Sequence, residues 1–203
     1  MTSVTIPNSV KCIGQSAFKG CSGLLSIIIP NSVTYIDYGA FSECYGLTSV
    51  TIGNSVTSIG EFAFADCKNL TTITIPNSVT SIGTAAFQKC SSLISVLLGN
   101  NLASIAPSAF WDCNNLSSIN IPNSVTSIGN HAFYGCKRLT SIIIPNSVMS
   151  IGVQVFSGCN DLTSVSYLCS PTSIGKDIFK DCDNIKEVTL DCDKVPSNIF
   201  SRT

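Results

Sequence analysis

The sequence predicts an α/β repeat solenoid, because one 23-residue pattern fills nearly all of the 203 residues. Three columns of this repeat support the prediction: a Phe, a Cys three residues later, and a Leu or Ile three residues after that. The Phe column comprises Phe18, Phe41, Phe64, Phe87, Phe110, Phe133, Phe156 and Phe179. Such unbroken spacing indicates stacked units, each of which buries its apolar face only against its neighbours.

The first part of each repeat predicts a half-buried β-strand. In residues 70–75 apolar and polar side chains alternate, so Ile73 and Ile75 are expected to face the core. Pro76 then ends the strand, because proline has no N–H group to donate to a ladder. Equivalent strands, the first centred on Val4, are expected to stack in parallel about 4.8 Å apart.

The second part of each repeat predicts a short helical segment. The apolar residues there are spaced by four, one, three and three positions, as in Ile82, Ala86, Phe87, Cys90 and Leu93. This spacing would place them on one face of a helix. Parallel strands need a crossover connection, which the helical segment would supply with the usual right hand. The expected fold is therefore a right-handed stack with a parallel sheet on one face and short helical segments on the other.

Residues 1–203 are expected to form a single domain that is a fragment of a longer array. Met1 already stands in the Leu column, and the chain ends before its last repeat reaches another Cys or Leu. The terminal strands would then be exposed edges.

The composition argues against several kinds of partner. Charged residues make up only 11% of the chain and the net charge is -1, so no nucleic-acid partner is expected. No apolar run approaches the roughly 18 residues of a membrane span, so no membrane insertion is expected. The first ten residues have neither the charged flank nor the apolar core of a secretory signal, which leaves an intracellular location open.

No catalytic residues, no metal site and no cofactor are expected. The single histidine, His131, stands in a column that otherwise holds Ser, Gly, Phe, Ala, Gln and Asp, so a surface position is expected. Cys136 follows it by five residues but belongs to the Cys column, where burial would keep it from pairing with His131. The 23-residue spacing between cysteines is the repeat period rather than zinc-ligand spacing.

Two columns predict structural ladders. The cysteines are expected to be reduced, buried and unreactive, because Cβ atoms about 4.8 Å apart exceed disulfide reach. Inner members of this column are Cys44, Cys67, Cys90, Cys113 and Cys136. Asparagines after the strand are expected to bond turn backbone in their own or the next repeat. They are Asn31, Asn54, Asn77, Asn100, Asn123 and Asn146.

Two further cysteines take the Asn position in the last two repeats. Cys169 and Cys192 are 23 residues apart, so they are expected to be stacked neighbours in a turn. A disulfide there would stabilise the end of the array, and two free thiols are the alternative.

Aromatic residues outside the Phe column are the candidate binding residues. Trp111 and Tyr134 share the column after the Phe in adjacent repeats, so their rings are expected about 5 Å apart on the helical face. Exposed Trp and Tyr are frequent in interaction hot spots. The contact surface would also include Phe62, Tyr35, Tyr38 and Tyr45. Chance surface decoration is the alternative, and the outward Ser, Thr and aliphatic residues of the strands form a competing surface.

The repeated string LTSIxIPNSVTSIGxxAFxxC, as in residues 70–90 and 139–159, resembles the BspA-like (Treponema pallidum type) leucine-rich-repeat family. The resemblance covers nearly all of residues 1–190. It implies a non-catalytic leucine-rich-repeat stack, located at the cell surface or secreted. It also implies adhesion or binding to a protein or glycan ligand, such as host matrix or a cell surface. The alternative function is a structural spacer or a scaffold segment of a larger protein.

Overall fold

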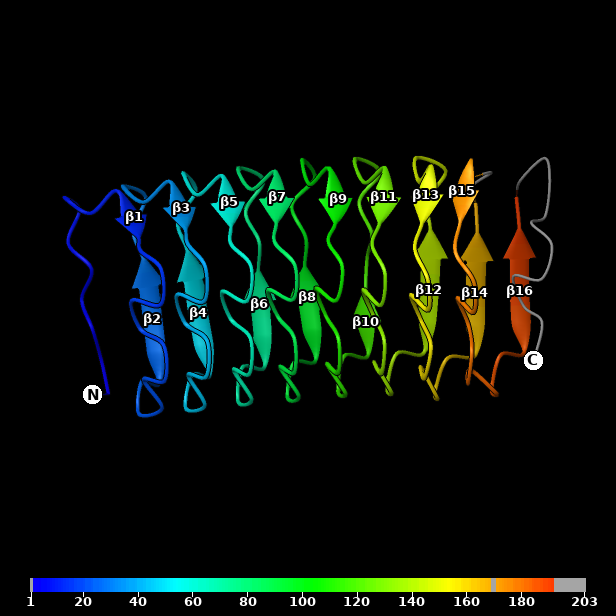
Figure 1. Cartoon of the computed structure of the whole chain (residues 1–203), viewed down its shortest axis with the longest axis horizontal. Helices are drawn as coiled ribbons and strands as arrows, with labels where there is room; N and C mark the ends of the chain where they lie inside the picture. Colours follow the sequence, from blue (N-terminus) through cyan, green and yellow to red (C-terminus); the bar gives the residue numbers. More distant parts are fainter. Residues whose placement is uncertain (1, 169–170, 192–203) are drawn as a thin grey trace.

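The repeats stack side by side into an elongated parallel β-solenoid (Figure 1). The computed structural model describes residues 2–168 and 171–191. Over these residues the chain forms sixteen strands and no helix. Each complete repeat contributes one strand to each of two rows, which Figure 1 shows running along the long axis of the molecule.

The first row, which we name the long-strand ladder, contains the strands that the alternating pattern predicted. Its members pair in parallel at a shift of one repeat, as Ile27 of β2 does with Val50 of β4, and they form three separate sheets along the row. The ladder consists of β2 (Ser26–Ile29), β4 (Ser49–Ile52), β6 (Thr72–Thr74), β8 (Ser95–Leu97), β10 (Ser118–Ile119), β12 (Ser141–Ile144), β14 (Ser164–Tyr167) and β16 (Glu187–Leu190). No strand forms around Val4, where the sequence predicted one.

A second row, the short-strand ladder, was not predicted. Each of its strands contains two residues, of which the Ile points inward. The ladder consists of β1 (Cys12–Ile13), β3 (Tyr35–Ile36), β5 (Ser58–Ile59), β7 (Ser81–Ile82), β9 (Ser104–Ile105), β11 (Ser127–Ile128), β13 (Ser150–Ile151) and β15 (Ser173–Ile174). These strands also pair in parallel, one repeat apart, in two sheets that divide between β7 and β9.

The predicted helical segments are wrong, because this part of each repeat is a series of turns. Residues 84–89 are turns in which Ala85 and Lys89 have φ values of 55° and 58°. This left-handed region is incompatible with a right-handed α-helix. The Phe87 N–H donates to the Ala109 carbonyl of the next repeat at 2.9 Å, whereas the Gln88 N–H bonds back to Ala85 at 3.1 Å. A helix would have kept both bonds within one segment.

The core lies between the two ladders and the turns. The eight rings from Phe18 to Phe179 form one continuous stack, with consecutive centroids 5.1–5.5 Å apart and planes within 8° of parallel. Rows of Ile, Val, Ala and Leu surround this stack and are buried over most of its length. The predicted disulfide between Cys169 and Cys192 lies outside the described residues.

Candidate binding surface

The turns present a surface of their own, which we name the turn face. It consists of residues 15–20 and their equivalents every 23 residues. One column of this face has a positive φ in every repeat: Ser16, Gly39, Phe62, Ala85, Ser108, His131, Gln154 and Asp177. Most members are small or polar, whereas Phe62 and His131 carry rings in a conformation that L-residues adopt only at a cost.

Three rings form a cluster on the turn face, which we name the Trp111 cluster: Trp111, His131 and Tyr134. The Trp111 and Tyr134 centroids, expected about 5 Å apart, lie 5.6 Å apart in an edge-to-face arrangement. The His131 ring stacks on Trp111 at 5.7 Å and lies 5.9 Å from Tyr134. Its Nε2 atom is 3.1 Å from the Gln154 side-chain oxygen, which holds the imidazole in place. All three rings are half-buried, so one part packs and the other faces solvent.

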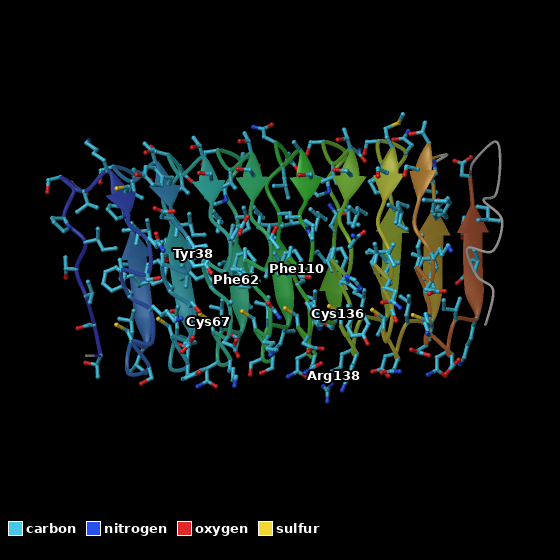
Figure 2. All side chains as sticks on the ribbon, in the orientation of Figure 1. Tyr38, Phe62, Cys67, Phe110, Cys136 and Arg138 are labelled. Carbon is cyan, nitrogen blue, oxygen red and sulfur yellow. The ribbon has the colours of Figure 1, made fainter. Side chains whose placement is uncertain are left out.

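A second aromatic pair lies nearer the start of the solenoid. Tyr38 and Phe62 come from adjacent repeats and meet edge to face, with centroids 5.7 Å apart. Figure 2 shows the two side chains beside each other. Next to the pair lies a hollow of about 210 Å³ whose walls include Glu43 and Asp66. The pair therefore borders a concave site rather than a flat surface.

The remaining two aromatic candidates lie elsewhere, and no ring contact joins them to Tyr38 within the described residues. Tyr35 begins β3 on the short-strand ladder, in register with Cys12. The hydrogen bond with the Cys12 side chain raises the pKa of the Tyr35 hydroxyl. Tyr45 lies in the turn before β4, with the Lys68 ammonium 5.0 Å from its ring centroid. Among the described residues, no ring contact therefore joins Tyr35, Tyr38 and Tyr45 to one another.

His131 is the member of this surface that the sequence did not single out for binding. The sequence predicts only a surface position for it, because its column accepts residues of many types. Its position three residues before Tyr134 in a turn, and one repeat after Trp111, is the signal that could have placed it in the cluster.

The outward side of the long-strand ladder is the competing surface. Ile28 is 69% exposed and Leu97 is 63% exposed, and Ile143 of the same column is also exposed. Between them stand Thr51, Thr74 and Asn120. Within this column the exposed apolar side chains are separated by polar ones, so they form no continuous patch.

The inner cysteines, Cys44 to Cys136, are fully buried and in the thiol form. Figure 2 shows the sulfur atoms in one row, with Cys67 and Cys136 at the same level. Each thiol donates to the carbonyl of the Phe 26 residues earlier, as Cys90 does to Phe64. Burial raises the pKa of the Cys90 thiol well above its usual range and that of Cys44 to about 11. Few reactive thiolates exist at neutral pH under these conditions.

The asparagine column is less uniform than expected, because its side chains are exposed and only two of them bond the next repeat. The Asn31 side-chain oxygen accepts the Asn54 N–H at 2.7 Å, and that of Asn77 accepts the Asn100 N–H at 2.8 Å. Both donors follow a glycine, Gly53 or Gly99, rather than the usual proline. Asn123 and Asn146 stand in proline repeats and make no side-chain bond to the described residues.

Comparison with known proteins decides the family. The model of the BspA type leucine rich repeat region, in six copies, matches residues 1–117 and 103–203. The chain belongs to the BspA-type leucine-rich-repeat family. This confirms the resemblance noted in its repeated string. No curated protein matches this BspA-type chain.

Solved structures agree with this assignment. The T. pallidum leucine-rich-repeat protein is 28% identical, with a TM-score of 0.63 over 87% of this chain and 72% of its own. A leucine-rich-repeat protein from Bacteroides ovatus is 30% identical, with a TM-score of 0.60 over 89% of this chain and 59% of its own. The BspA-type chain therefore spans little more than half of the Bacteroides protein. Its membership in this family indicates a repeat-based binding or scaffold module.

Within residues 2–168 and 171–191, no group of three His, Cys, Asp or Glu side chains is placed to hold a metal ion. Over the same ranges, no helix has the length and apolar character needed to cross a membrane.

Proposed function

We propose that this BspA-type protein is a non-catalytic binding or adhesion module whose turn face contacts a protein or glycan partner. In this proposal it acts at the cell surface or after secretion, as the family resemblance implies, and its partners include host matrix and other cells. The observation that carries the proposal is the Trp111 cluster, in which three half-buried rings contact one another on one face.

The packing of the preceding residues supports a surface role for these rings. Phe110 and Phe133 are fully buried and already occupy the inward positions of both repeats. The equivalent residues of other repeats are Lys19, Ser42, Ala65, Gln88, Ser157 and Lys180, none of them aromatic, so the solenoid does not need a ring there. Trp and Tyr offer a large contact area with few rotatable bonds, which favours them at the centres of interfaces.

The proposal is tested with the double variant Trp111→Ala, Tyr134→Ala. Neither ring fills the core, so the far-UV spectrum and thermal midpoint are expected to stay near those of the parent. Retention of matrix proteins, cells or arrayed glycans is expected to fall by about tenfold or more, as for loss of a hot spot. The control variant is Ile28→Ser, Leu97→Ser, which changes the long-strand face and is expected to bind as the parent does. Unchanged binding by the first variant together with reduced binding by the second would move the site to the long-strand face.

The alternative is a structural spacer or scaffold segment. Hydroxyl groups beside both ladders favour it, because they bond neighbouring repeats. Thr57 Oγ1 donates to the Thr34 carbonyl at 3.0 Å, and Thr48 Oγ1 donates to the Leu25 carbonyl at 2.9 Å. Such bonds serve the continuity of the stack rather than a ligand. A spacer is expected to retain no matrix protein, cell or glycan in the same experiments, with or without the aromatic residues.

A further inference from the structure

We propose that the hollow beside Tyr38 and Phe62 is a subsite for one neutral pyranose ring of a glycan. The inference rests on the proposed function of the turn face as a binding surface and names the chemistry of one part of it. The hollow measures about 210 Å³. Pockets for drug-sized ligands range from about 300 to 1,000 Å³, so this one suits a smaller group such as a single sugar ring.

The shape of the hollow comes from a local change in side-chain size. Part of its lining consists of the small residues Gly39, Ser42 and Ala65, so the turn surface is recessed there. Phe62 and Tyr38 rise beside them, with their ring planes 62° apart. The C–H groups of a pyranose carry partial positive charge and pack well on the electron-rich face of an aromatic ring. The aromatic pair therefore provides the apolar wall that one face of a sugar requires.

Phe62 is an unusual residue for its position. It has a φ of 54°, and the two neighbours in its column are Gly39 and Ala85. A bulky residue in this conformation is less stable than Gly by about 1–2 kcal/mol. Its ring is only half-buried, so core packing does not account for its presence. Contact with a ligand does account for it.

Polar groups complete the lining and match a hydroxylated ligand. The Glu43 and Asp66 carboxylates can accept hydrogen bonds from sugar hydroxyls, and the Gln88 amide can both donate and accept. The Lys19 ammonium, also at the hollow, provides further donors. A pyranose presents alternating hydroxyl groups at its edge, and such a mixed lining can bond several of them.

The charges favour a neutral ligand over a cationic side chain of a protein. Glu43 lies 3.2 Å from the Lys19 ammonium, and Asp66 lies 3.7 Å from the Lys68 ammonium. Both carboxylates therefore already have a counter-charge, which weakens their attraction for an arriving arginine or lysine. The hydroxyls of a sugar can still donate to the paired carboxylates, because a neutral donor does not depend on a net local charge.

The experiment uses saturation-transfer NMR on the whole chain with methyl glycosides of glucose, galactose, mannose and N-acetylglucosamine. At least one is expected to bind, with a Kd of about 1 mM, as for a single small contact. Phe62→Ser is expected to weaken that binding by about tenfold, because it removes the aromatic wall. Serine occupies the same column at Ser16 and Ser108, so the fold should tolerate it. Glu43→Gln keeps the shape of the hollow and is expected to weaken the same glycoside, which provides a second test if Phe62→Ser fails to fold.

Ile28→Ser is the matched control, because it removes an exposed apolar side chain from the long-strand face and leaves both aromatic clusters and the hollow intact. Glycoside binding that survives Ile28→Ser and is lost in Phe62→Ser supports the subsite. Binding of none of the four glycosides, or binding that is lost in Ile28→Ser but kept in Phe62→Ser, overturns the subsite. Binding of arginine methyl ester in place of the glycosides also overturns it, in favour of a protein ligand. The proposed function itself fails separately, through the matrix, cell and glycan retention measured for the Trp111, Tyr134 double variant.

Discussion

The thiol of Cys90 donates a hydrogen bond to the carbonyl oxygen of Phe64 in the preceding repeat, with 3.2 Å between sulfur and oxygen. The same oxygen also accepts the Cys67 N–H group, at 3.2 Å. Equivalent thiol bonds recur along the column at Cys44, Cys67, Cys90, Cys113, Cys136, Cys159 and Cys182. The cysteine column therefore fastens each turn to the one before it without any disulfide within the described residues.

Cys90→Ala is expected to lower the free energy of unfolding by about 1–2 kcal/mol, mainly through the lost packing of a buried sulfur. The loss is limited because the Phe64 carbonyl keeps its bond from Cys67. Cys21→Ala is the control, since Cys21 opens the column and is only half-buried. Urea denaturation measures both. If the two substitutions lowered the free energy of unfolding by the same amount, burial of the Cys90 sulfur would contribute no additional stability.

Loss of a ring from the middle of the Phe stack is expected to destabilise the chain more than loss of the first ring. Phe87 is fully buried between two rings, and Phe87→Ala is expected to destabilise the chain by about 3–5 kcal/mol. Phe18 stacks on one ring and is partly exposed, so Phe18→Ala should have a smaller effect. Thermal and urea unfolding of the two variants checks this order. A larger loss at Phe18 would contradict a stack whose stability comes from neighbours on both sides.

The sequence predicted the strands and the core columns because both depend on a strict period. Ile73 within β6 and Ile75 directly after it are both buried, as the alternation predicted. The helical prediction failed because apolar spacings of three and four also suit consecutive turns, each about three residues long. Gly20 and Gly39 stand in the two columns with positive φ, and this was the available signal for left-handed turns. Strands of two residues are too short for any periodicity to reveal.

Among the aromatic candidates, residues in adjacent repeats make ring contacts, whereas residues close together within one repeat do not. Trp111 and Tyr134 stand 23 residues apart, so stacking brings them together, with centroids at 5.6 Å. Tyr35, Tyr38 and Tyr45 are close in sequence, yet each repeat distributes its residues around the perimeter of the solenoid. Tyr38 meets Phe62 of the next repeat instead. Closeness across repeats is therefore a better guide to surface clusters in this fold than closeness along the chain.

The asparagine column predicts unequal effects of one substitution. Asn77→Ala removes the acceptor of the Asn100 N–H and is expected to lower the free energy of unfolding by about 0.5–1.5 kcal/mol, the usual value of one exposed hydrogen bond. Asn123→Ala removes an exposed side chain with no such bond and should have almost no effect. Urea midpoints of the two variants test the difference. Identical midpoints would mean that the Asn77 bond contributes no stability.

Alkaline pH is expected to destabilise the solenoid through its buried thiols. Burial raises the pKa of Cys67, Cys90 and Cys113 well above the ordinary value of 9.0, and that of Cys44 from 9.0 to about 11. Above about pH 9 the unfolded chain loses thiol protons that the folded chain keeps, so the unfolded state is favoured as pH rises. Each such thiol lowers the free energy of unfolding by about 1.4 kcal/mol per pH unit until its folded pKa is reached. Below about pH 8 the thiols contribute no pH dependence, because both states are protonated.

Urea midpoints measured from about pH 7.5 to pH 10.5 should therefore fall steeply only in the upper part of that range. Other groups, such as lysines, also titrate there, so a variant is needed to isolate the thiols. The double substitution Cys90→Ala, Cys113→Ala removes two fully buried thiols and should give a shallower alkaline decline than the parent, although its stability at neutral pH is lower. Parallel declines for parent and variant would show that the buried thiols are not the cause of the alkaline loss, since two fewer groups would then titrate with no change in slope.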